Sequence, residues 1–198
     1  IISFIRRCEG ARAHVTALPE ALYAAVSQVE HGVGLMFQVE TPRPVLPDAL
    51  VQSAVLLDGV QDPGNVGSIL RSAAAAGIGQ VYCAEGTAFC WSPKVLRAAM
   101  GAHFVLEIFE NVDLASLVKA SKIAVLATSG YAEQRLYDVD LRQPVAWLLG
   151  HEGQGVAAAL LAMATHQVVI PHARQVESLN VAACAAVCFF EQLRQNQA

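Results

Sequence analysis

The sequence predicts an α/β fold, with a mostly parallel sheet and helices on both of its faces. The first observation is alternation, since short apolar runs are separated by stretches with the spacing of amphipathic helices. The second is composition. The 198 residues are 55% hydrophobic and only 15% charged, which is ample for a large core and argues against disorder.

The expected elements follow one another along the chain. Strands are expected at 54–57, 80–84, 104–109, 123–128, 145–149 and 166–170. Helices are expected at 65–76, 93–100, 113–120, 156–163 and 178–194. Each apolar run is short and is separated from the next by helical sequence, so the strands are expected to lie parallel.

A proline-rich segment, Thr41–Pro47, divides the chain and indicates a stiff linker. We expect residues 1–47 to hold the remnant of a small N-terminal domain with this linker, and residues 48–198 to form the main domain. No apolar run approaches the roughly 18 residues that cross a membrane. The five cysteines form no C-x-x-C pair, which indicates reduced thiols in a cytoplasmic protein and no metal site.

The segment after the first expected strand, Gln61–Ser72, carries the most information. Pro63 and Gly64 indicate a turn, and Asn65 is the expected N-cap of the next helix. On that helix Arg71 borders an apolar stripe. An arginine near a helix start suits an anionic ligand, and a solvated surface arginine is the alternative.

Two later strand ends also carry polar loops. Gly150–Gly155 has three glycines in six residues, which lets backbone approach a ligand closely, and Glu152 stands in that loop. The segment 170–181 ends a strand and opens a helix, with Ser178 as the expected N-cap and Asn180 in the first turn. Ligands bind at the carboxyl ends of parallel strands, so the three segments predict one ligand site.

In this order the three segments resemble the sequence motifs of the SpoU (TrmH-like) family of RNA 2′-O-ribose methyltransferases, within the SPOUT superfamily. The matching residues are, motif by motif, Asn65, Gly67 and Arg71; Gly150, Glu152, Gly153 and Gly155; and Ile170, Pro171, Ser178, Leu179 and Asn180. A further similar segment is Lys94–Ala102, and the resemblance covers roughly residues 52–194. Any single motif is weak, whereas three in order are specific.

The resemblance implies features that no pattern argument finds. The C-terminal segment is expected to form a trefoil knot, an exception to the rule against threaded chains, with S-adenosylmethionine bound in the knot. Gly150, Ile170 and Leu179 are expected to contact this cofactor, with Thr128 and Gly130 as a further wall. The resemblance also implies a homodimer whose active sites lie near the subunit boundary. From the sequence alone, Ile170 and Leu179 are predicted as core residues.

The reaction implied by the resemblance is methyl transfer to a ribose 2′-hydroxyl. That hydroxyl is a weak nucleophile, so alignment and a base are required. The arginine matching Arg71 has been proposed as the base in the family, but a guanidinium holds its proton tightly. We expect Arg71 to bind the target phosphate and orient the hydroxyl, with an RNA phosphate relaying the proton. Asn65, Glu152, Ser178 and Asn180 are expected to fix this arginine and the ribose, and a purely structural Glu152 is the alternative.

The expected partner is structured RNA, with ribosomal RNA favoured over transfer RNA. Family members of this type often carry an RNA-binding domain where residues 1–47 stand here. The net charge of −4 is unusual for an RNA enzyme, because backbone recognition needs a basic footprint. Local basic patches are therefore expected to bind RNA, formed by the arginines within residues 6–12 and by Lys94 and Arg97.

Two other classes of protein fit parts of the pattern. A Rossmann oxidoreductase would share the alternation and a glycine loop, but G-x-G-x-x-G is missing after the first expected strand. A non-catalytic RNA-binding relative of the fold should have lost Asn65, Arg71 or Asn180, and all three are present.

Three residues depart from the family pattern. His151 stands where a small or amide residue is usual, and His172 and Arg174 replace the commoner methionine and glycine. A distinct RNA target or loop drift would each account for them. His151 as a general base is one interpretation, since histidine changes charge near neutral pH, and a surface-loop histidine is the other.

Overall fold

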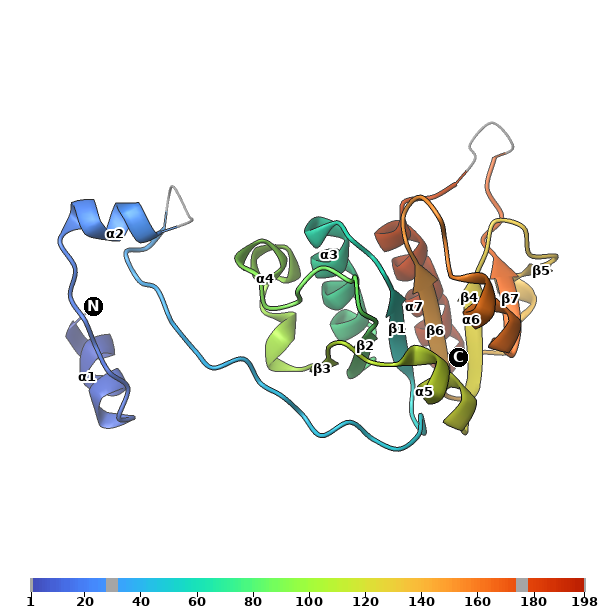
Figure 1. Ribbon diagram of the computed structural model, residues 1–198, viewed down its shortest axis with the longest axis horizontal. Coiled ribbons are helices and arrows are strands. Elements are labelled where there is room, and N and C mark those ends of the chain that lie inside the picture. Colours follow the sequence, from blue (N-terminus) through green and yellow to red (C-terminus); the bar gives the residue numbers. More distant parts are fainter. Residues whose placement is uncertain (1, 28–31, 174–177, 198) are drawn as a thin grey trace. The chain divides into compact units, whose positions relative to one another are not determined.

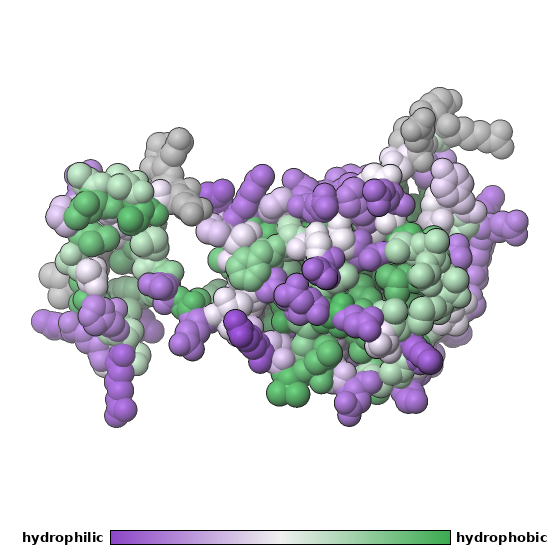
Figure 2. All heavy atoms as spheres, in the orientation of Figure 1, coloured by the Kyte–Doolittle hydropathy of each residue, from purple (hydrophilic) through white to green (hydrophobic). Residues whose placement is uncertain are grey.

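The computed structural model describes residues 2–27, 32–173 and 178–197, and it divides into two units, residues 1–40 and residues 41–198. The N-terminal unit contains helices α1 (Ile2–Gly10) and α2 (Glu20–Val26). Phe4 packs edge-to-face on Phe37, with the ring centroids 5.9 Å apart. None of the side chains described in this unit is buried, and apolar groups are prominent on its surface (Figure 2). That residues 1–47 hold an RNA-binding domain stays a prediction.

The second unit is built on one parallel sheet (Figure 1). Its strand order is β3-β2-β1-β6-β4-β7-β5, and each of the six pairs of neighbouring strands runs parallel. The strands are β1 (Ala54–Asp58), β2 (Gln80–Cys83), β3 (Glu107–Phe109), β4 (Ala124–Thr128), β5 (Gln134–Arg135), β6 (Val145–Gly150) and β7 (His166–Val169). The α/β class with a parallel sheet is therefore confirmed.

Helices cover both faces of this sheet, as the sequence predicts. Buried side chains of α3 (Pro63–Ala75), α4 (Pro93–Ala99) and α7 (Val181–Gln197) share one core layer. Those of α5 (Leu114–Ala120) and α6 (Ala158–Met163) share the other. Trp147 of the central strand β6 is fully buried, and its indole N–H donates to Gln192 of α7 at 2.7 Å. Two short 3-10 helices complete the unit, η1 (Ala102–Phe104) and η2 (Leu136–Asp138).

Helix α3 begins earlier than expected. Pro63 occupies its first turn, where a missing N–H is harmless, so the turn predicted at Pro63 and Gly64 is wrong. The N-cap is Asp62, whose Oδ1 accepts from the backbone N–H of Asn65 at 2.8 Å. Asn65 is therefore not the cap, and its side chain remains available for other contacts.

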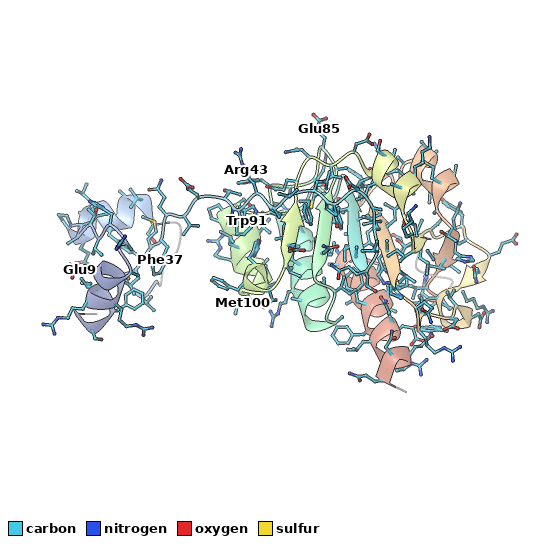
Figure 3. All side chains as sticks on the ribbon, turned by 90° about the horizontal axis from the view of Figure 1, so that it is seen from below. Glu9, Phe37, Arg43, Glu85, Trp91 and Met100 are labelled. Atoms are coloured by element: carbon cyan, nitrogen blue, oxygen red, sulfur yellow. The ribbon has the colours of Figure 1, made fainter. Side chains whose placement is uncertain are left out.

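Gly67 lets α3 approach α4 closely. A Cβ at Gly67 would overlap the side chain of Ala98 and lie 2.8 Å from the carbonyl oxygen of Val95. Helix α3 follows the carboxyl end of β1, and α4 follows the carboxyl end of β2. The close contact at Gly67 therefore helps to hold the start of α3 in place. Figure 3 shows Met100, at the end of α4, and Glu85, in the loop after β2, projecting from this part of the unit.

Helix α7 begins later than expected and extends further, from Val181 to Gln197. The predicted N-cap, Ser178, precedes it by three residues. Asn180 takes this role instead, because its Oδ1 accepts from the backbone N–H groups of Ala182 at 2.9 Å and Ala183 at 3.2 Å. Within this largely apolar helix, Ala183 and Phe190 are exposed in the single chain.

Two smaller differences concern strands. The strand expected at 104–109 is only Glu107–Phe109, because η1 ends on Phe104 and a turn follows it at Val105. Strand β5 was not predicted, since two residues are too short to show a period. In the part of the chain that the structure describes, no helix combines the length and apolar character needed to cross a membrane.

Candidate active site

A cavity of about 660 Å³ opens where β4, β6 and β7 end. Its walls are residues 128–131 at the end of β4, 150–156 at the end of β6, 168–170 and 172 at the end of β7, and the approach to α7. The cavity thus lies outside the carboxyl ends of parallel strands, where α/β sheets commonly bind ligands. All of the predicted cofactor residues line this cavity, namely Thr128, Gly130, Gly150, Ile170 and Leu179.

Backbone forms the wall of the cavity at Gly150. The loop after it folds back, because the N–H of His151 donates to the carbonyl of Gly155 at 3.0 Å and the reverse bond is 2.8 Å. Gly155 supports this turn with a φ of +71°, a left-handed value that favours glycine. A Cβ at Gly150 would overlap the backbone of Gly155 and Val156. Gly150 is thus required for the loop to close beside the cavity.

Glu152 ties this loop to the start of α3. Its Oε2 accepts from the backbone N–H of Gln61 at 3.1 Å. Its Oε1 accepts from the backbone N–H of Asp62 at 3.1 Å and from the side-chain amide of Asn65 at 3.0 Å. The carboxylate therefore joins the first motif to the second. This is the structural role that the sequence left open as an alternative.

Asn65 is also hydrogen-bonded to the third motif. The side-chain amide of Asn180 donates to Oδ1 of Asn65 at 2.9 Å, while the other end of Asn180 caps α7. Glu152, Asn65 and Asn180 thus form one hydrogen-bonded chain, which we call the inter-motif chain. These side chains were expected to fix Arg71, but the bonds run among themselves.

The inter-motif chain keeps Glu152 ionised. Partial burial favours the neutral acid, but the hydrogen bonds from Asn65 and from the backbone, including the N–H groups of Gln61 and Asp62, lower the pKa of Glu152 to about 2. A protonated Glu152 would lose acceptor capacity towards these donors. The carboxylate form is therefore the one that holds the motifs together.

Arg71 lies apart from these groups. It is exposed, does not line the cavity, and makes no hydrogen bond or ion pair with any residue that the structure describes. Ser178 does line the cavity. The structure thus places Ser178 beside the inter-motif chain and the cavity, and it leaves Arg71 outside this group.

The two departing histidines that the structure describes have defined partners. Nδ1 of His151 accepts from the backbone N–H groups of Gly153 at 2.9 Å and Gln154 at 3.2 Å, so this nitrogen supports the loop. Nδ1 of His172 lies 2.7 Å from the carbonyl oxygen of Ile170, to which it donates. Both histidines line the cavity, whereas Arg174 lies outside the described residues.

Among the further side chains that line the cavity, Tyr131 and Cys184 were not predicted there. Tyr131 stands in the loop after β4, and Cys184 lies in the second turn of α7. A hydrogen bond from Cys188 lowers the pKa of Cys184; burial opposes this, while Thr128 and the charge of His172 add to it. No motif marks either residue, and only the strand-end position of the loop pointed towards Tyr131. Within the described residues, no cluster of histidine, cysteine and acidic side chains suits a metal ion.

A parallel sheet with a strand-end cavity, closed by a glycine loop and by polar groups from three loop segments, defines a cofactor-binding α/β protein. Comparison with known proteins makes the class specific. Residues 52–190 match the model of the SpoU rRNA methylase family. The chain belongs to this family, which confirms the expectation from the three motifs and leaves the oxidoreductase alternative without support.

Individual relatives agree. An uncharacterized tRNA/rRNA methyltransferase of Synechocystis is 38% identical over 77% of this chain and 57% of its own length. The 23S rRNA (guanosine(2553)-2′-O)-methyltransferase RlmP of Bacillus subtilis is 34% identical over 87% of this chain and 70% of its own length. The chain therefore spans only part of each relative.

A solved structure shares the fold. The SpoU methyltransferase AviRb from Streptomyces viridochromogenes, crystallised in complex with AdoMet (S-adenosylmethionine), superposes with a TM-score of 0.69 and 30% identity. The match covers 80% of this chain and 67% of that one.

Proposed function

We propose that the protein transfers a methyl group from S-adenosylmethionine to a ribose 2′-hydroxyl of structured RNA, with ribosomal RNA favoured over transfer RNA. The observation that carries this proposal is the inter-motif chain, in which Glu152, Asn65 and Asn180 bring three motifs to the rim of one cavity. The relative RlmP, named as a 2′-O-methyltransferase of 23S rRNA, supports the reaction and the choice of ribosomal RNA.

The cavity suits the proposed cofactor. At Gly150 it offers backbone where a side chain would not fit, and Thr128 and Gly130 face it from the loop after β4. Ile170 and Leu179 add apolar surface for the adenosine part of a nucleoside ligand. When bound, S-adenosylmethionine supplies an electrophilic methyl group. The AdoMet complex of AviRb supports this choice of ligand.

On the acceptor side, the protein has to align a hydroxyl and accept or relay its proton. We assign to Arg71 the binding of a phosphate beside the target ribose and the orientation of the 2′-hydroxyl, with that phosphate relaying the proton. The exposure of Arg71 suits a group that meets RNA from solvent. We assign contacts with the ribose to Ser178 and Asn180, and their position in the cavity wall supports this assignment. Glu152 acts as a positioning residue, since its carboxylate is occupied by three donors.

RNA backbone binding is assigned to local positive charge. Lys94 and Arg97 are exposed on α4, the helix that packs on α3. Arg71 is exposed on α3 itself. Phosphate contacts of this kind position a substrate without reading its sequence. The reaction on RNA also leads us to infer a cytoplasmic location.

We further propose that the protein acts as a homodimer and that its C-terminal segment is threaded as a trefoil knot. Dimerisation is supported by α7, an apolar helix that leaves Ala183 and Phe190 exposed in a single chain. The knot is supported by family membership and by the insertion of β6 between β1 and β4.

The test begins with calorimetric titration of the protein with S-adenosylmethionine, beside NADH and beside the Leu179→Arg variant. Binding of the methyl donor alone, abolished by the variant, is expected. The second step is methyl transfer from labelled S-adenosylmethionine to transcripts of 23S rRNA and of transfer RNA, with 2′-O-methylation read as resistance to alkaline cleavage. A folded protein that binds no methyl donor would overturn the proposal and favour a non-catalytic RNA-binding relative.

A further inference from the structure

Tyr131 is the most exposed large apolar or aromatic side chain that the structure describes, with its full surface open to solvent. Single exposed aromatic side chains are common on proteins, so exposure alone decides nothing. Position does. Among the exposed large hydrophobic side chains of the described residues, only Tyr131 and Leu179 line the cavity, and Leu179 is 37% exposed.

The loop that carries Tyr131 is held in place. The backbone N–H of Ser129 donates to the carbonyl of Val168 on β7 at 3.0 Å, which fixes the loop to the neighbouring strand. The N–H of Tyr131 donates to the hydroxyl of Ser129 at 3.3 Å, and the N–H of Ala132 donates to the carbonyl of Ser129 at 3.3 Å. The ring is therefore presented to solvent by an ordered turn, and it gains no stabilisation from burial within this chain.

The methyl acceptor has to reach the cavity from solvent. A nucleotide that enters a cavity has to leave the base stack, and proteins commonly receive the unstacked base on an aromatic side chain. A tyrosine ring that contributes to the cavity wall, and yet keeps its whole surface open, lies at the mouth through which the nucleotide passes. A ring devoted to the bound cofactor would be shielded in part by the walls that hold that cofactor.

We propose that Tyr131 stacks on a nucleobase of the RNA substrate at the mouth of this cavity, and so positions the acceptor nucleotide. The inference rests on the proposed function. Stacking tolerates any base, because every base has a π-face. Tyr131 therefore contributes affinity and alignment, whereas the choice of base belongs to hydrogen-bonding groups elsewhere.

The experiment compares Tyr131→Ala and Tyr131→Phe with the control Tyr137→Ala. Tyr137 is 53% exposed in η2 and does not line the cavity. For each protein, KM and kcat for methylation of a 23S rRNA transcript are measured, with the Kd for S-adenosylmethionine from calorimetry and the oligomeric state from gel filtration. We expect Tyr131→Ala to raise the KM for RNA by roughly 5- to 150-fold, the range of one lost stacking contact.

The controls separate stacking from other roles. Tyr131→Phe keeps the ring and should stay within about 2-fold of the wild type, and Tyr137→Ala should do the same. The Kd for S-adenosylmethionine should not change in any variant. A wild-type KM in Tyr131→Ala would overturn the inference, as would a loss of S-adenosylmethionine affinity equal to the loss of RNA affinity, which would place the ring on the cofactor.

Dissociation of an oligomer by Tyr131→Ala would also overturn the inference, since the ring would then lie against a second copy of the chain. Failure of the proposed function looks different. In that case the wild-type protein itself would methylate neither transcript, and the stacking role would fall with it. An active wild type with an unaffected Tyr131→Ala variant would leave the proposed function standing and remove only Tyr131.

Discussion

The early and late parts of helix α3 differ in how much of their environment this chain supplies. Asn65, in the first turns, is bonded to Glu152 and Asn180, and its backbone N–H is bonded to the N-cap Asp62. Arg71, six residues later, is exposed and has no polar partner among the described residues. Both residues belong to one motif, yet only Asn65 has polar side-chain partners among the described residues.

This difference indicates how cofactor binding and RNA binding are divided between the two parts of α3 in the proposed reaction. The groups around the cofactor cavity are fixed before any ligand arrives, which lowers the entropy lost on binding. The side chain of Arg71 would be ordered only by a group from outside this chain, which we propose to be a phosphate of the substrate or a second subunit. Variants at the two parts of α3 should therefore fail in different assays, and their largest effects should appear at Arg71.

The largest effect is expected for Arg71→Ala. Methyl transfer to RNA should fall by about 10²-fold or more, the loss that a small misplacement of the reacting groups causes. The Kd for S-adenosylmethionine should stay that of the wild type, because Arg71 does not line the cavity. Kinetics with 23S rRNA and calorimetry measure the two quantities. A comparable loss of cofactor affinity would break the comparison between the two parts of α3.

The next effect concerns the wall of the cavity. Gly150→Ala introduces a Cβ that would overlap Gly155 and Val156, so the loop has to shift. Overpacking of this kind typically costs about 1–3 kcal/mol, which predicts a rise of roughly 5- to 150-fold in the Kd for S-adenosylmethionine, along with lower stability.

The matched control lies three residues away. A Cβ at Gly153 would meet only the ring of His151, at 3.6 Å, an ordinary contact. Gly153→Ala should therefore bind S-adenosylmethionine as the wild type does. Equal losses in both variants would mean that loop flexibility, and not the close approach at Gly150, matters for the cofactor.

The sequence predicted the parallel sheet and the residues that line the cavity. It did not predict the hydrogen bonds between the motifs. Thr128, Gly150 and Leu179 could be placed because each follows a recognisable strand or matches a motif. The bonds from Glu152 to residues 61 and 62 span about 90 positions, and no periodicity records a pairing of that kind. Asn65 was expected to cap α3, since capping residues and bonding asparagines look alike in a sequence.

A third effect tests the charge of the inter-motif chain. Glu152→Gln replaces an acceptor with a donor beside the N–H groups of Gln61 and Asp62. We expect a loss of about 1–2 kcal/mol in the free energy of unfolding at pH 7, since hydrogen bonds to charged groups are worth more than neutral ones and exposure weakens them. Urea unfolding of wild type and variant measures this difference.

The pH dependence gives a second reading of the same variant. The pKa of Glu152 is about 2 in the folded protein, below its usual value of about 4.3. A lowered carboxyl pKa adds stability above the unfolded pKa, and this stability is lost as the pH falls through the folded pKa. The difference between wild type and Glu152→Gln should thus be constant above about pH 5 and shrink between about pH 4.3 and pH 2. A difference that grows on acidification would contradict the assigned bonds.

The smallest effect is expected for the N-caps, where the cap of α3 is compared with that of α5. Asp62 and Asp113 are both N-caps, of α3 and α5, and both accept from backbone N–H groups in the first turn. Replacing either with alanine should lower the free energy of unfolding by about 0.5–1 kcal/mol. Only Asp62→Ala should also weaken S-adenosylmethionine binding, because the lost cap holds Asn65 in place and its turn holds the backbone N–H of residue 62 against Glu152. If Asp113→Ala weakened cofactor binding equally, the loss would reflect lower overall stability. The early part of α3 would then have no special role in holding the cofactor cavity in place.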